Sequence, residues 1–384
     1  MVHRVYLDNS ATTPVAPEVV EAMIPYFDQW YGNPSSLHEE GQRARQAVED
    51  SRGEIASYLG VQASEILFTS GATEANNLAI QGLALARPDK RHIITSKIEH
   101  HAVLHTCQWL EKRGYALTAL DVDAFGRVDL EQLHKAIDDN TLVVSIMAGN
   151  NEIGTLQPLE EIGTICEEKG IPFHTDAVQA FGKISLPIQH IDLLSVSAHK
   201  LHGPKGIGFL YVRRGISLSP LFHGGGHERG RRSGTENVSG IVGMAMASRL
   251  AFAEQKSLTQ RMNGFRKRMI RAIEAIPASR LNGHPEEGLP HIINVSFAGI
   301  EGESLVMRLS DHGIAVSTGS ACSSPTLEPS HVLLAIGVPI SMAHGSLRIS
   351  TGRQTTNEDI NVLLNTLPNV VDELRTMSPF KVSE

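Results

Sequence analysis

The stretch Ser195-Val-Ser-Ala-His-Lys-Leu-His-Gly-Pro-Lys-Gly-Ile-Gly208 carries one lysine, Lys200, just before a glycine-rich turn. The apolar run at residues 191–196 predicts one short buried strand, and the run at residues 209–212 predicts another. Lys200 is therefore expected on a tight connection between two strands. A lysine held beside hydroxyls and apolar strands can lose its proton and form a Schiff base with an aldehyde, whereas a solvated loop lysine does neither. This stretch alone leaves both interpretations open.

Apolar runs and helical periodicities alternate in the sequence around this stretch, most regularly from residue 66 onward. Strands are predicted at residues 5–7, 66–69, 92–95, 116–120, 142–147 and 172–175, and helices at residues 17–30, 37–59, 74–86, 102–113, 129–137 and 159–169. Alternation at this spacing predicts an α/β fold with a mostly parallel sheet sandwiched by helices. Ligands of such sheets bind at the carboxyl ends of the strands, so the candidate residues are expected there.

The pattern changes after Ser239. A long helical region at residues 242–276 is followed by mixed α and β elements that continue to the end of the sequence. A chain of this length exceeds one simple core. We therefore predict a large domain at residues 14–255 and a smaller α+β domain that combines residues 1–13 with residues 256–384.

The composition is that of an ordinary soluble globular protein, with 384 residues, 41% of them apolar and 20% charged. The formal net charge is −8 and no basic run exceeds Arg229-Gly-Arg-Arg232, so nucleic acid is not expected as a ligand. No secretory signal core or membrane span is visible, which predicts a cytoplasmic protein without a membrane partner. Cys107, Cys166 and Cys322 have no metal-type spacing and leave an odd thiol, which argues against a secreted disulfide framework.

The turn Thr69-Ser-Gly-Ala-Thr73 lies between a predicted strand and a predicted helix. Backbone N–H groups at a helix start point at whatever occupies that end, so this turn is a candidate anion site. A plain helix cap by the side chain of Ser70 or Thr73 is the alternative.

Asp176 follows the predicted strand at residues 172–175. A buried aspartate needs a partner that is positive or donates strongly, and the protonated nitrogen of a pyridine cofactor would serve. A capping or salt-bridge role is the alternative.

Two histidine pairs invite a zinc interpretation, but neither supports it. His100 and His101 are adjacent, so on a strand they would face opposite ways, one functional and the other merely exposed. His223 and His227 have helical spacing, but the three glycines between them disfavour a helix. The glycines at residues 203–208 precede a strand instead of opening a helix, and their order is not that of a dinucleotide-binding loop. Neither a metal nor a dinucleotide site is expected.

Cys322 stands in a small, polar segment, Val316-Ser-Thr-Gly-Ser-Ala-Cys-Ser-Ser-Pro325, away from any apolar stripe. Cys107 and Cys166 lie instead within helical patterns, where a cysteine usually behaves as a small buried hydrophobe. The thiolate is the nucleophilic form of cysteine, and an exposed loop can deliver one. Cys322 is therefore the candidate nucleophile, with an inert loop thiol as the alternative.

A connecting lysine, a strand-end aspartate, an anion-binding helix start and a loop cysteine together indicate a pyridoxal-phosphate site with an extra nucleophile. With these residues the chain resembles the NifS/IscS-type cysteine desulfurases of the class-V aminotransferase family, which implies the type I fold of pyridoxal-phosphate-dependent transferases. The resemblance covers nearly the whole chain and rests on these ordered motifs: Tyr6-Leu-Asp-Asn9, Ala11-Thr-Thr-Pro14, Gly32-Asn-Pro-Ser35, Thr69-Ser-Gly-Ala-Thr-Glu-Ala-Asn76, Glu99-His100, Asn150-Asn-Glu-Ile-Gly154, His174-Thr-Asp-Ala177, His199-Lys-Leu-His-Gly-Pro-Lys-Gly206, Gly224-Gly-Gly-His-Glu-Arg229, Arg232-Ser-Gly-Thr235, Gly319-Ser-Ala-Cys322 and Arg348-Ile-Ser350.

The resemblance implies which residues contact the cofactor, pyridoxal 5'-phosphate. Lys200 would form the Schiff base, His100 would stack on the ring and move protons, and Asp176 would pair with the ring nitrogen. The remaining contacts would be Asn151 and Gln179 at the ring substituents and phenolic oxygen, Ala72, Thr73, Ser197 and His199 at the phosphate, and Thr235 reaching the phosphate of a partner subunit in a homodimer.

The resemblance also implies the reaction, which converts L-cysteine to L-alanine. Lys200 would remove the α-proton, and Arg348, with Asn151, would hold the substrate, its planar fork gripping the carboxylate. The Cys322 thiolate would then take the sulfur as a persulfide, and the same thiol is a candidate transient ligand of an iron–sulfur cluster.

The sulfur acceptor stays open between an iron–sulfur scaffold protein and a thiolation protein. Two rival functions also stay open. One is a related pyridoxal-phosphate enzyme, such as an aminotransferase or selenocysteine lyase, that does not depend on Cys322. The other is a catalytically silent sulfur-relay or scaffold subunit.

Overall fold

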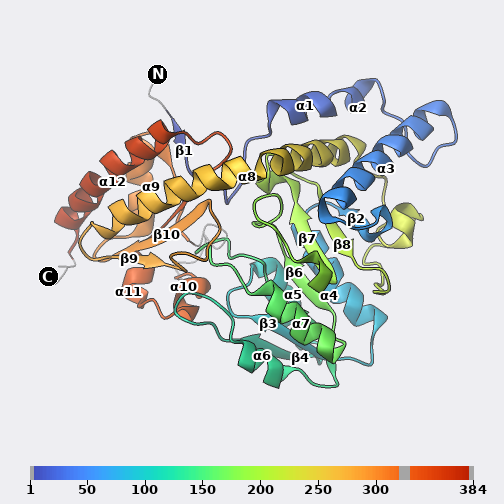
Figure 1. Cartoon of the computed structure of the whole chain (residues 1–384), viewed down its shortest axis with the longest axis horizontal. Helices are drawn as coiled ribbons and strands as arrows, with labels where there is room; N and C mark the ends of the chain where they lie inside the picture. The colour runs from blue at the N-terminus through green and yellow to red at the C-terminus, as the bar shows by residue number, and fades with distance from the viewer. Residues whose placement is uncertain (1–3, 320–328, 380–384) are drawn as a thin grey trace.

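The computed structural model describes residues 4–319 and 329–379 of the chain. Figure 1 shows two bodies of packed helices and strands, with the long helix α8 (Val238–Glu274) extending across both. No described helix has a stretch apolar enough to cross a membrane.

A seven-stranded sheet forms the centre of the larger body, in the spatial order β2-β8-β7-β6-β5-β3-β4. Its strands are β2 (Ile66–Thr69), β3 (His92–Ser96), β4 (Ala116–Leu120), β5 (Thr141–Ser145), β6 (Phe173–Asp176), β7 (Leu193–Ser197) and β8 (Gly208–Val212). Strand β8 runs antiparallel to β2 and β7, whereas every other pair in this sheet is parallel. The predicted mostly parallel sheet is therefore confirmed.

Both faces of this sheet are buried, which explains why its strands read as continuous apolar runs. Ile66 and Phe68 of β2 belong to the core on one face, whereas Leu67 between them belongs to the core on the other. Cys107 and Cys166 are buried in these two cores, as their helical patterns predict. The helices that pack on the sheet are α3 (Glu39–Leu59), α4 (Ala72–Ala86), α5 (His101–Glu111), α6 (Leu130–Ala136) and α7 (Leu159–Lys169).

The helix predicted at residues 17–30 is wrong as a single element. The structure has two short helices instead, α1 (Pro17–Met23) and α2 (Pro25–Asp28). Pro25 has no backbone N–H and occupies the first turn of α2, where a proline is tolerated, so it ends one helix and begins the next.

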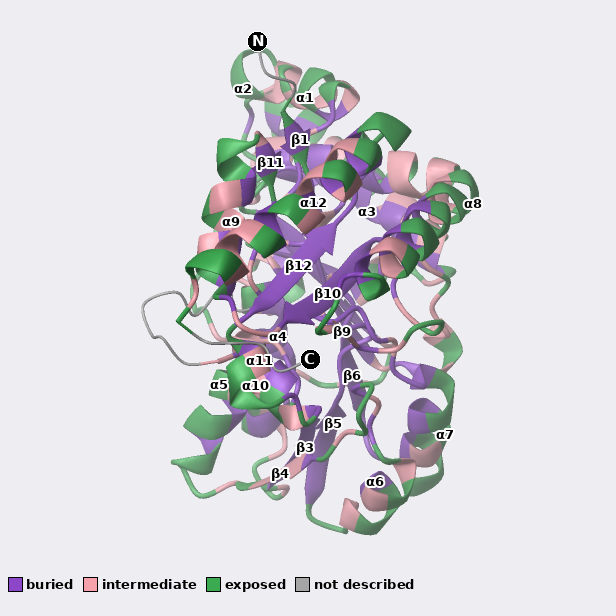
Figure 2. Cartoon of the chain, turned by 90° about the vertical axis from the view of Figure 1, so that its left-hand side faces the viewer, coloured by how far each residue is buried: buried purple, intermediate pink, exposed green. Residues whose placement is uncertain are grey.

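The smaller body contains a three-stranded antiparallel sheet, in the order β12-β10-β9. Its strands are β9 (Ser279–Asn282), β10 (Ile292–Phe297) and β12 (Ser346–Ser350), and the helices around it are α9 (Gly302–Asp311), α10 (His331–Ala335), α11 (Ile340–Ala343) and α12 (Asn357–Met377). Figure 2 shows buried strands of both sheets, among them β5, β6, β10 and β12, with helices around them whose outer faces are exposed. The N-terminal strand β1 (Val5–Tyr6) pairs in parallel with β11 (Ile314–Ala315) and packs with this body.

Helix α8 belongs to both cores. Ile241 and Met244 in its first half pack with the core of the larger sheet, whereas Phe265 and Met269 in its second half pack with the core of the smaller body. The predicted domain boundary near residue 255 falls inside this uninterrupted helix, and the division into two domains stays a prediction.

Candidate active site

Five parallel strands bring most of the predicted site residues to one edge of the larger sheet. Strands β2, β3, β5, β6 and β7 all end there, because each is parallel to the others and only β8 is reversed. The residues at or just beyond these strand ends are Ala72, Thr73, His100, Asn151, Asp176, Ser197, His199 and Lys200. The carboxyl edge of the sheet is thus the candidate active site.

Lys200 ends the 3-10 helix η3 (Ala198–Lys200), which continues directly from β7 into the connection to β8. This confirms its predicted place between two strands. Its Nζ donates hydrogen bonds to the backbone oxygens of Ser10 at 2.5 Å and Ala11 at 2.7 Å. The solvated-loop interpretation is therefore wrong, because the amine is held against the N-terminal segment.

The turn before α4 forms an anion cradle. Its N-cap is Gly71, with a φ of 149°, and no side chain caps the helix, so the side-chain cap by Ser70 or Thr73 is wrong. A Cβ added to Gly71 would lie 3.6 Å from Ser197 Oγ, and one on Gly208 would lie 2.4 Å from Val196 O and 2.8 Å from Gly71 Cα. Two glycines thus bring the first N–H groups of α4, at Ala72 and Thr73, beside the Ser197 hydroxyl.

Asp176 ends β6 and is 6% exposed. Its Oδ2 accepts a hydrogen bond from Asn76 Nδ2 at 2.7 Å, and its Oδ1 accepts one from Val178 N at 3.0 Å. No ion pair joins it to a side chain in residues 4–319 or 329–379, so a salt-bridge role is not supported there. A carboxylate has acceptor sites for about four hydrogen bonds, so Asp176 can still accept from a protonated ring nitrogen.

His100 is the N-cap of α5, and its Nδ1 accepts a hydrogen bond from Ala102 N at 3.1 Å. This leaves the proton of a neutral imidazole on Nε2. His101 begins the helix and stacks with His105 at 4.8 Å between ring centroids, and burial lowers its pKa to about 4. The prediction that the two histidines alternate on a strand is wrong, because the chain has already entered a helix.

Within the described part of the chain, no group of three or more metal-ligating side chains is arranged to hold an ion.

Arg348 of β12 reaches the edge of the larger sheet from the smaller body. It is 3% exposed, its Nη1 donates to Asn151 O at 3.1 Å, and its Nη2 pairs with Asp8 Oδ1 at 3.1 Å. Its Nε has no partner among the described residues. A buried guanidinium with an unused donor suits an incoming carboxylate.

Gln179 and His199 line the N-terminal segment close to Lys200. Gln179 Nε2 donates to Ser10 O at 3.0 Å, the same acceptor that Lys200 uses, and His199 Nδ1 lies 3.1 Å from Thr12 Oγ1. Thr235 makes no hydrogen bond to this group within the described residues and is exposed, in the segment before α8.

Two buried carboxyl groups at the site were not assigned a role from the sequence, although both stand in its motifs. Glu99 precedes His100, and burial raises its pKa to about 8. Glu152 follows Asn151, and burial raises its pKa to about 7. Asn76, the partner of Asp176, was also missed. Their positions in Thr69–Asn76, Glu99–His100 and Asn150–Gly154 were the only signal available.

Cys322 lies outside the described residues. The described residues on either side of it both contact Glu152: Ser330 Oγ donates to Glu152 Oε2 at 2.5 Å, and a Cβ added to Gly319 would lie 3.1 Å from the same oxygen. Glu152 follows Asn151 in the sequence, so Gly319 and Ser330 both lie beside the candidate site.

Known proteins resemble this chain over nearly its whole length, in sequence and in fold. The family model described as aminotransferase class-V matches residues 5–363. The chain is 53% identical to "Cysteine desulfurase IscS" of Methanosarcina thermophila, over 99% of this chain and 95% of that protein, and 51% identical to the protein of the same name from Dictyoglomus turgidum, over 99% and 98%.

Solved structures give the same result. A "NifS-like protein" that is 41% identical superposes with a TM-score of 0.91 over 97% of this chain and 100% of that one. A structure described as "SspA in complex with cysteine", also 41% identical, superposes with a TM-score of 0.80 over 92% of this chain and 100% of that one. The resemblance inferred from the motifs is confirmed: the chain belongs to the aminotransferase class-V family.

Proposed function

We propose that this protein is a pyridoxal-phosphate-dependent cysteine desulfurase, which converts L-cysteine to L-alanine and transfers the sulfur to its own Cys322. The observation that carries the proposal is the placement of the Lys200 amine at one sheet edge with an uncapped helix start and a buried aspartate. Relatives at 53% and 51% identity that bear the name cysteine desulfurase support it.

The residues at the sheet edge fit the cofactor. The N–H groups at the start of α4 and the Ser197 hydroxyl suit a phosphate, because the N-cap glycine has no side chain to cap them and the nearby Glu74 carboxylate is bonded to Ser70 N and Arg232 instead. Asp176 suits a protonated ring nitrogen, since it is buried and accepts two hydrogen bonds from the described residues, which leaves acceptor capacity. We assign His199, Gln179 and Asn151 to the same site because they lie beside these groups. Bound pyridoxal phosphate supplies an aldehyde for an amine and a ring that accepts the electrons of a broken Cα–H bond.

The protein's own groups then divide the work. Arg348 orients the substrate carboxylate through its fork. Lys200, as a free amine, takes the proton from Cα, and His100 moves a proton at Nε2. The Cys322 thiolate attacks the substrate sulfur, so an S–S bond forms as the Cβ–S bond breaks, and the carbon fragment takes up protons to become alanine.

We further propose that two chains form a homodimer in which Thr235 reaches the phosphate of the partner subunit. The exposure of Thr235 in an isolated chain supports this assignment. We place the domain boundary inside α8, whose halves pack with different cores. A cytoplasmic location and an iron–sulfur scaffold or thiolation protein as acceptor complete the proposal.

The replacement Cys322→Ser tests the proposal. Cofactor binding and the spectral change on adding L-cysteine are expected to persist, because neither needs the thiol. Alanine release is expected to fall by about two orders of magnitude or more, because a hydroxyl is a far weaker nucleophile toward sulfur. The measurement is alanine formed from L-cysteine under excess reductant, with Cys166→Ser, a buried thiol in α7, as the matched control.

Equal alanine formation by Cys322→Ser and the unmodified protein would contradict the persulfide step. That result would favour a selenocysteine lyase or aminotransferase. Absence of turnover in the unmodified, cofactor-loaded protein would instead favour the silent relay subunit.

A further inference from the structure

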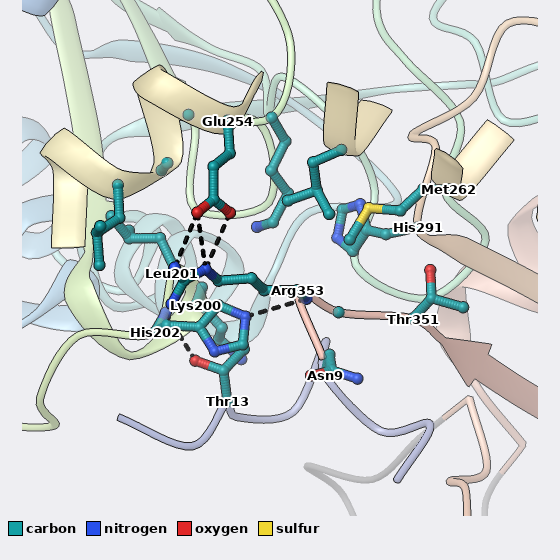
Figure 3. Close-up of a pocket in the computed structure, with 16 residues that line it drawn as sticks. Asn9, Thr13, Lys200, Leu201, His202, Glu254, Met262, His291, Thr351 and Arg353 are labelled. Atoms are coloured by element: carbon teal, nitrogen blue, oxygen red, sulfur yellow. Dashed lines mark hydrogen bonds and ion pairs between the residues drawn. The ribbon is translucent and has the colours of Figure 1, made fainter. Parts of the chain in front are cut away.

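A cavity of about 40 Å³ lies on the side of Lys200 that faces helix α8. Figure 3 shows it between the N-terminal segment at Asn9 and Thr13, helix α8 at Glu254, and the segment after β12 at Thr351 and Arg353. Of the residues predicted for the active site, Lys200 alone is among those that line it. The cavity therefore lies behind the cofactor lysine and is separate from the anion cradle.

Lys183 is a second lysine that lines this cavity. The residue as a whole is half-buried, but its Nζ is fully buried and has no hydrogen-bond partner among the described residues. Its backbone is fixed, since the Lys183 oxygen accepts a hydrogen bond from Thr259 Oγ1 of α8 at 2.8 Å. A buried ammonium without a partner is costly, so a lysine in this position needs an explanation.

The other ionisable groups of the cavity are neutral or paired. Arg353 Nη2 binds Glu254 Oε1 at 2.8 Å and also Glu18 Oε1 at 3.0 Å. His202 Nε2 accepts from Arg353 N at 3.3 Å, so its proton is on Nδ1, which faces Pro14 O at 3.0 Å, and burial lowers its pKa to about 4.

His291 is neutral for a similar reason. Its Nε2 lies 3.2 Å from Gln179 Oε1, which must accept because Gln179 Nε2 donates to Ser10 O. Burial lowers the pKa of His291 well below its usual range. Its Nδ1 and Thr351 Oγ1 are also buried and without partners among the described residues, and both residues line the cavity. Among the lining groups, this leaves the two amines, Lys183 and Lys200, to be considered together.

We propose that Lys183 is a positioning residue for Lys200, and that its amine takes up a proton when Lys200 gives up its positive charge. The inference rests on the proposed function, because the Lys200 nitrogen gives up its charge when it acts as a base and when, attached to the cofactor, it is unprotonated. The shared cavity then holds about one positive charge in each state, and Lys200 reaches its neutral form without a change in the net charge of the buried region.

The electrostatics of the pair support this exchange. Burial, and secondly the charge of Lys200, lower the pKa of Lys183 to about 7. The coupling is reciprocal, so a charged Lys183 also weakens proton binding at Lys200. Once Lys200 is neutral, the repulsion ends and Lys183 binds a proton more strongly. A cavity of this volume, which both lysines line, admits water.

The test compares the full-length protein with Lys183→Met, which keeps the length of the side chain and removes the amine. Protons exchanged on adding pyridoxal phosphate to the cofactor-free protein are counted by calorimetry at pH 8, in two buffers of different ionisation enthalpy. When the cofactor is added, the number of protons that the unmodified protein takes up per subunit is expected to exceed the number for Lys183→Met by about half a proton or more. In the loaded protein, the pH at which the cofactor absorbance changes is expected to rise by about half a unit or more in Lys183→Met.

Lys256→Met is the matched control, because Lys256 is an exposed lysine of α8 and should leave both readouts unchanged. Lys183→Leu repeats the test if the methionine variant does not fold. Equal proton counts and equal absorbance profiles in Lys183→Met and the unmodified protein overturn the inference. Failure of the unmodified protein to attach the cofactor at Lys200, by borohydride reduction and peptide mapping, would overturn the proposed function instead.

Discussion

Glu99 shows how the surroundings of one residue set its charge beside the candidate site. Its Oε1 accepts hydrogen bonds from Ser96 Oγ at 2.8 Å and Met147 N at 2.9 Å, while Oε2 has no partner among the described residues. Burial, and to a lesser extent the charge of Asp176, raise its pKa to about 8. A protonated Glu99 places no negative charge beside Asp176, which suits the proposed pairing of Asp176 with a protonated ring nitrogen.

Replacing Glu99 with glutamine is expected to change how stability depends on pH. The pKa of Glu99 is about 8 in the folded state against 4.5 ordinarily, so the folded state holds an extra proton between these values. The contribution of this group to stability is complete below about pH 4.5 and is lost as the pH rises to about 8. Between pH 5 and pH 8, the unfolding free energy of the unmodified protein should fall by about 2–5 kcal/mol relative to Glu99→Gln.

Urea unfolding of the cofactor-free protein at several pH values measures this difference. Glu286→Gln, at an exposed glutamate, is the control and should follow the unmodified protein. Parallel curves for Glu99→Gln and the unmodified protein would mean that Glu99 is ionised at neutral pH.

At the scale of elements, the site depends on how closely β8 approaches the start of α4. Gly208 opens β8 and pairs with Thr69, at the end of β2, and with Ser197, at the end of β7. The absence of a side chain at Gly208 lets the backbone at Gly71 come into contact with it. The cradle is therefore formed by three neighbouring strands and one helix, and no single element contains it.

The replacement Gly208→Ala should disrupt this approach. A Cβ would lie 2.4 Å from Val196 O, which is backbone and cannot rotate away, so we expect a loss of about 2–4 kcal/mol in unfolding free energy. Cofactor affinity should fall as well, because the cradle moves. Gly53→Ala in α3 is the matched control: nothing lies within 4 Å of its Cβ, and it should stabilise by about 0.5–1 kcal/mol. Unchanged cofactor affinity in a folded Gly208→Ala protein would show that the cradle does not hold the phosphate.

At the scale of the whole molecule, the site needs both bodies. Arg348 and Asp8 come from the smaller body, and they meet Asn151 of the larger one. The N-terminal segment continues from Asp8 to the acceptors of Lys200, while α8 packs with both cores. The residues of the candidate site are thus positioned relative to one another by the packing of the two bodies.

Mixing two inactive variants tests whether the site also needs a second chain. Thr235→Ala should weaken cofactor binding in the partner subunit, and Lys200→Ala should abolish attachment in its own. In a heterodimer, the Thr235→Ala chain keeps its own Lys200 and receives the intact Thr235 of the other chain, so one of the two sites is complete. Because random pairing makes about half of the dimers heterodimers, coexpression should restore up to about a quarter of the sites of the unmodified dimer. Cofactor bound per subunit, after separation of differently tagged chains, measures this. If Thr235 served its own subunit, no complete site would form and the mixture would stay inactive.

The arrangement of the larger sheet and the identity of its central lysine follow from local patterns in the sequence. Residues 66–69 form β2 as predicted, because a strand buried on both faces is an uninterrupted apolar run wherever it lies. Lys200 stands between two such runs, so its position on the connection between two strands could also be predicted from the sequence. The break between α1 and α2 is also encoded locally, because Pro25 has no backbone N–H to continue the first helix.

Contacts between distant residues were decided only by the tertiary structure. Arg348 meets Asp8, and β1 pairs with β11, through contacts that no local period specifies. Lys183 has no sequence feature that distinguishes it from an exposed lysine, yet its amine is buried at a cavity that Lys200 also lines, because α8 and the N-terminal segment close over it. Periodicity reports which face of an element is apolar, whereas charge and proton affinity depend on whatever the rest of the chain packs against that face.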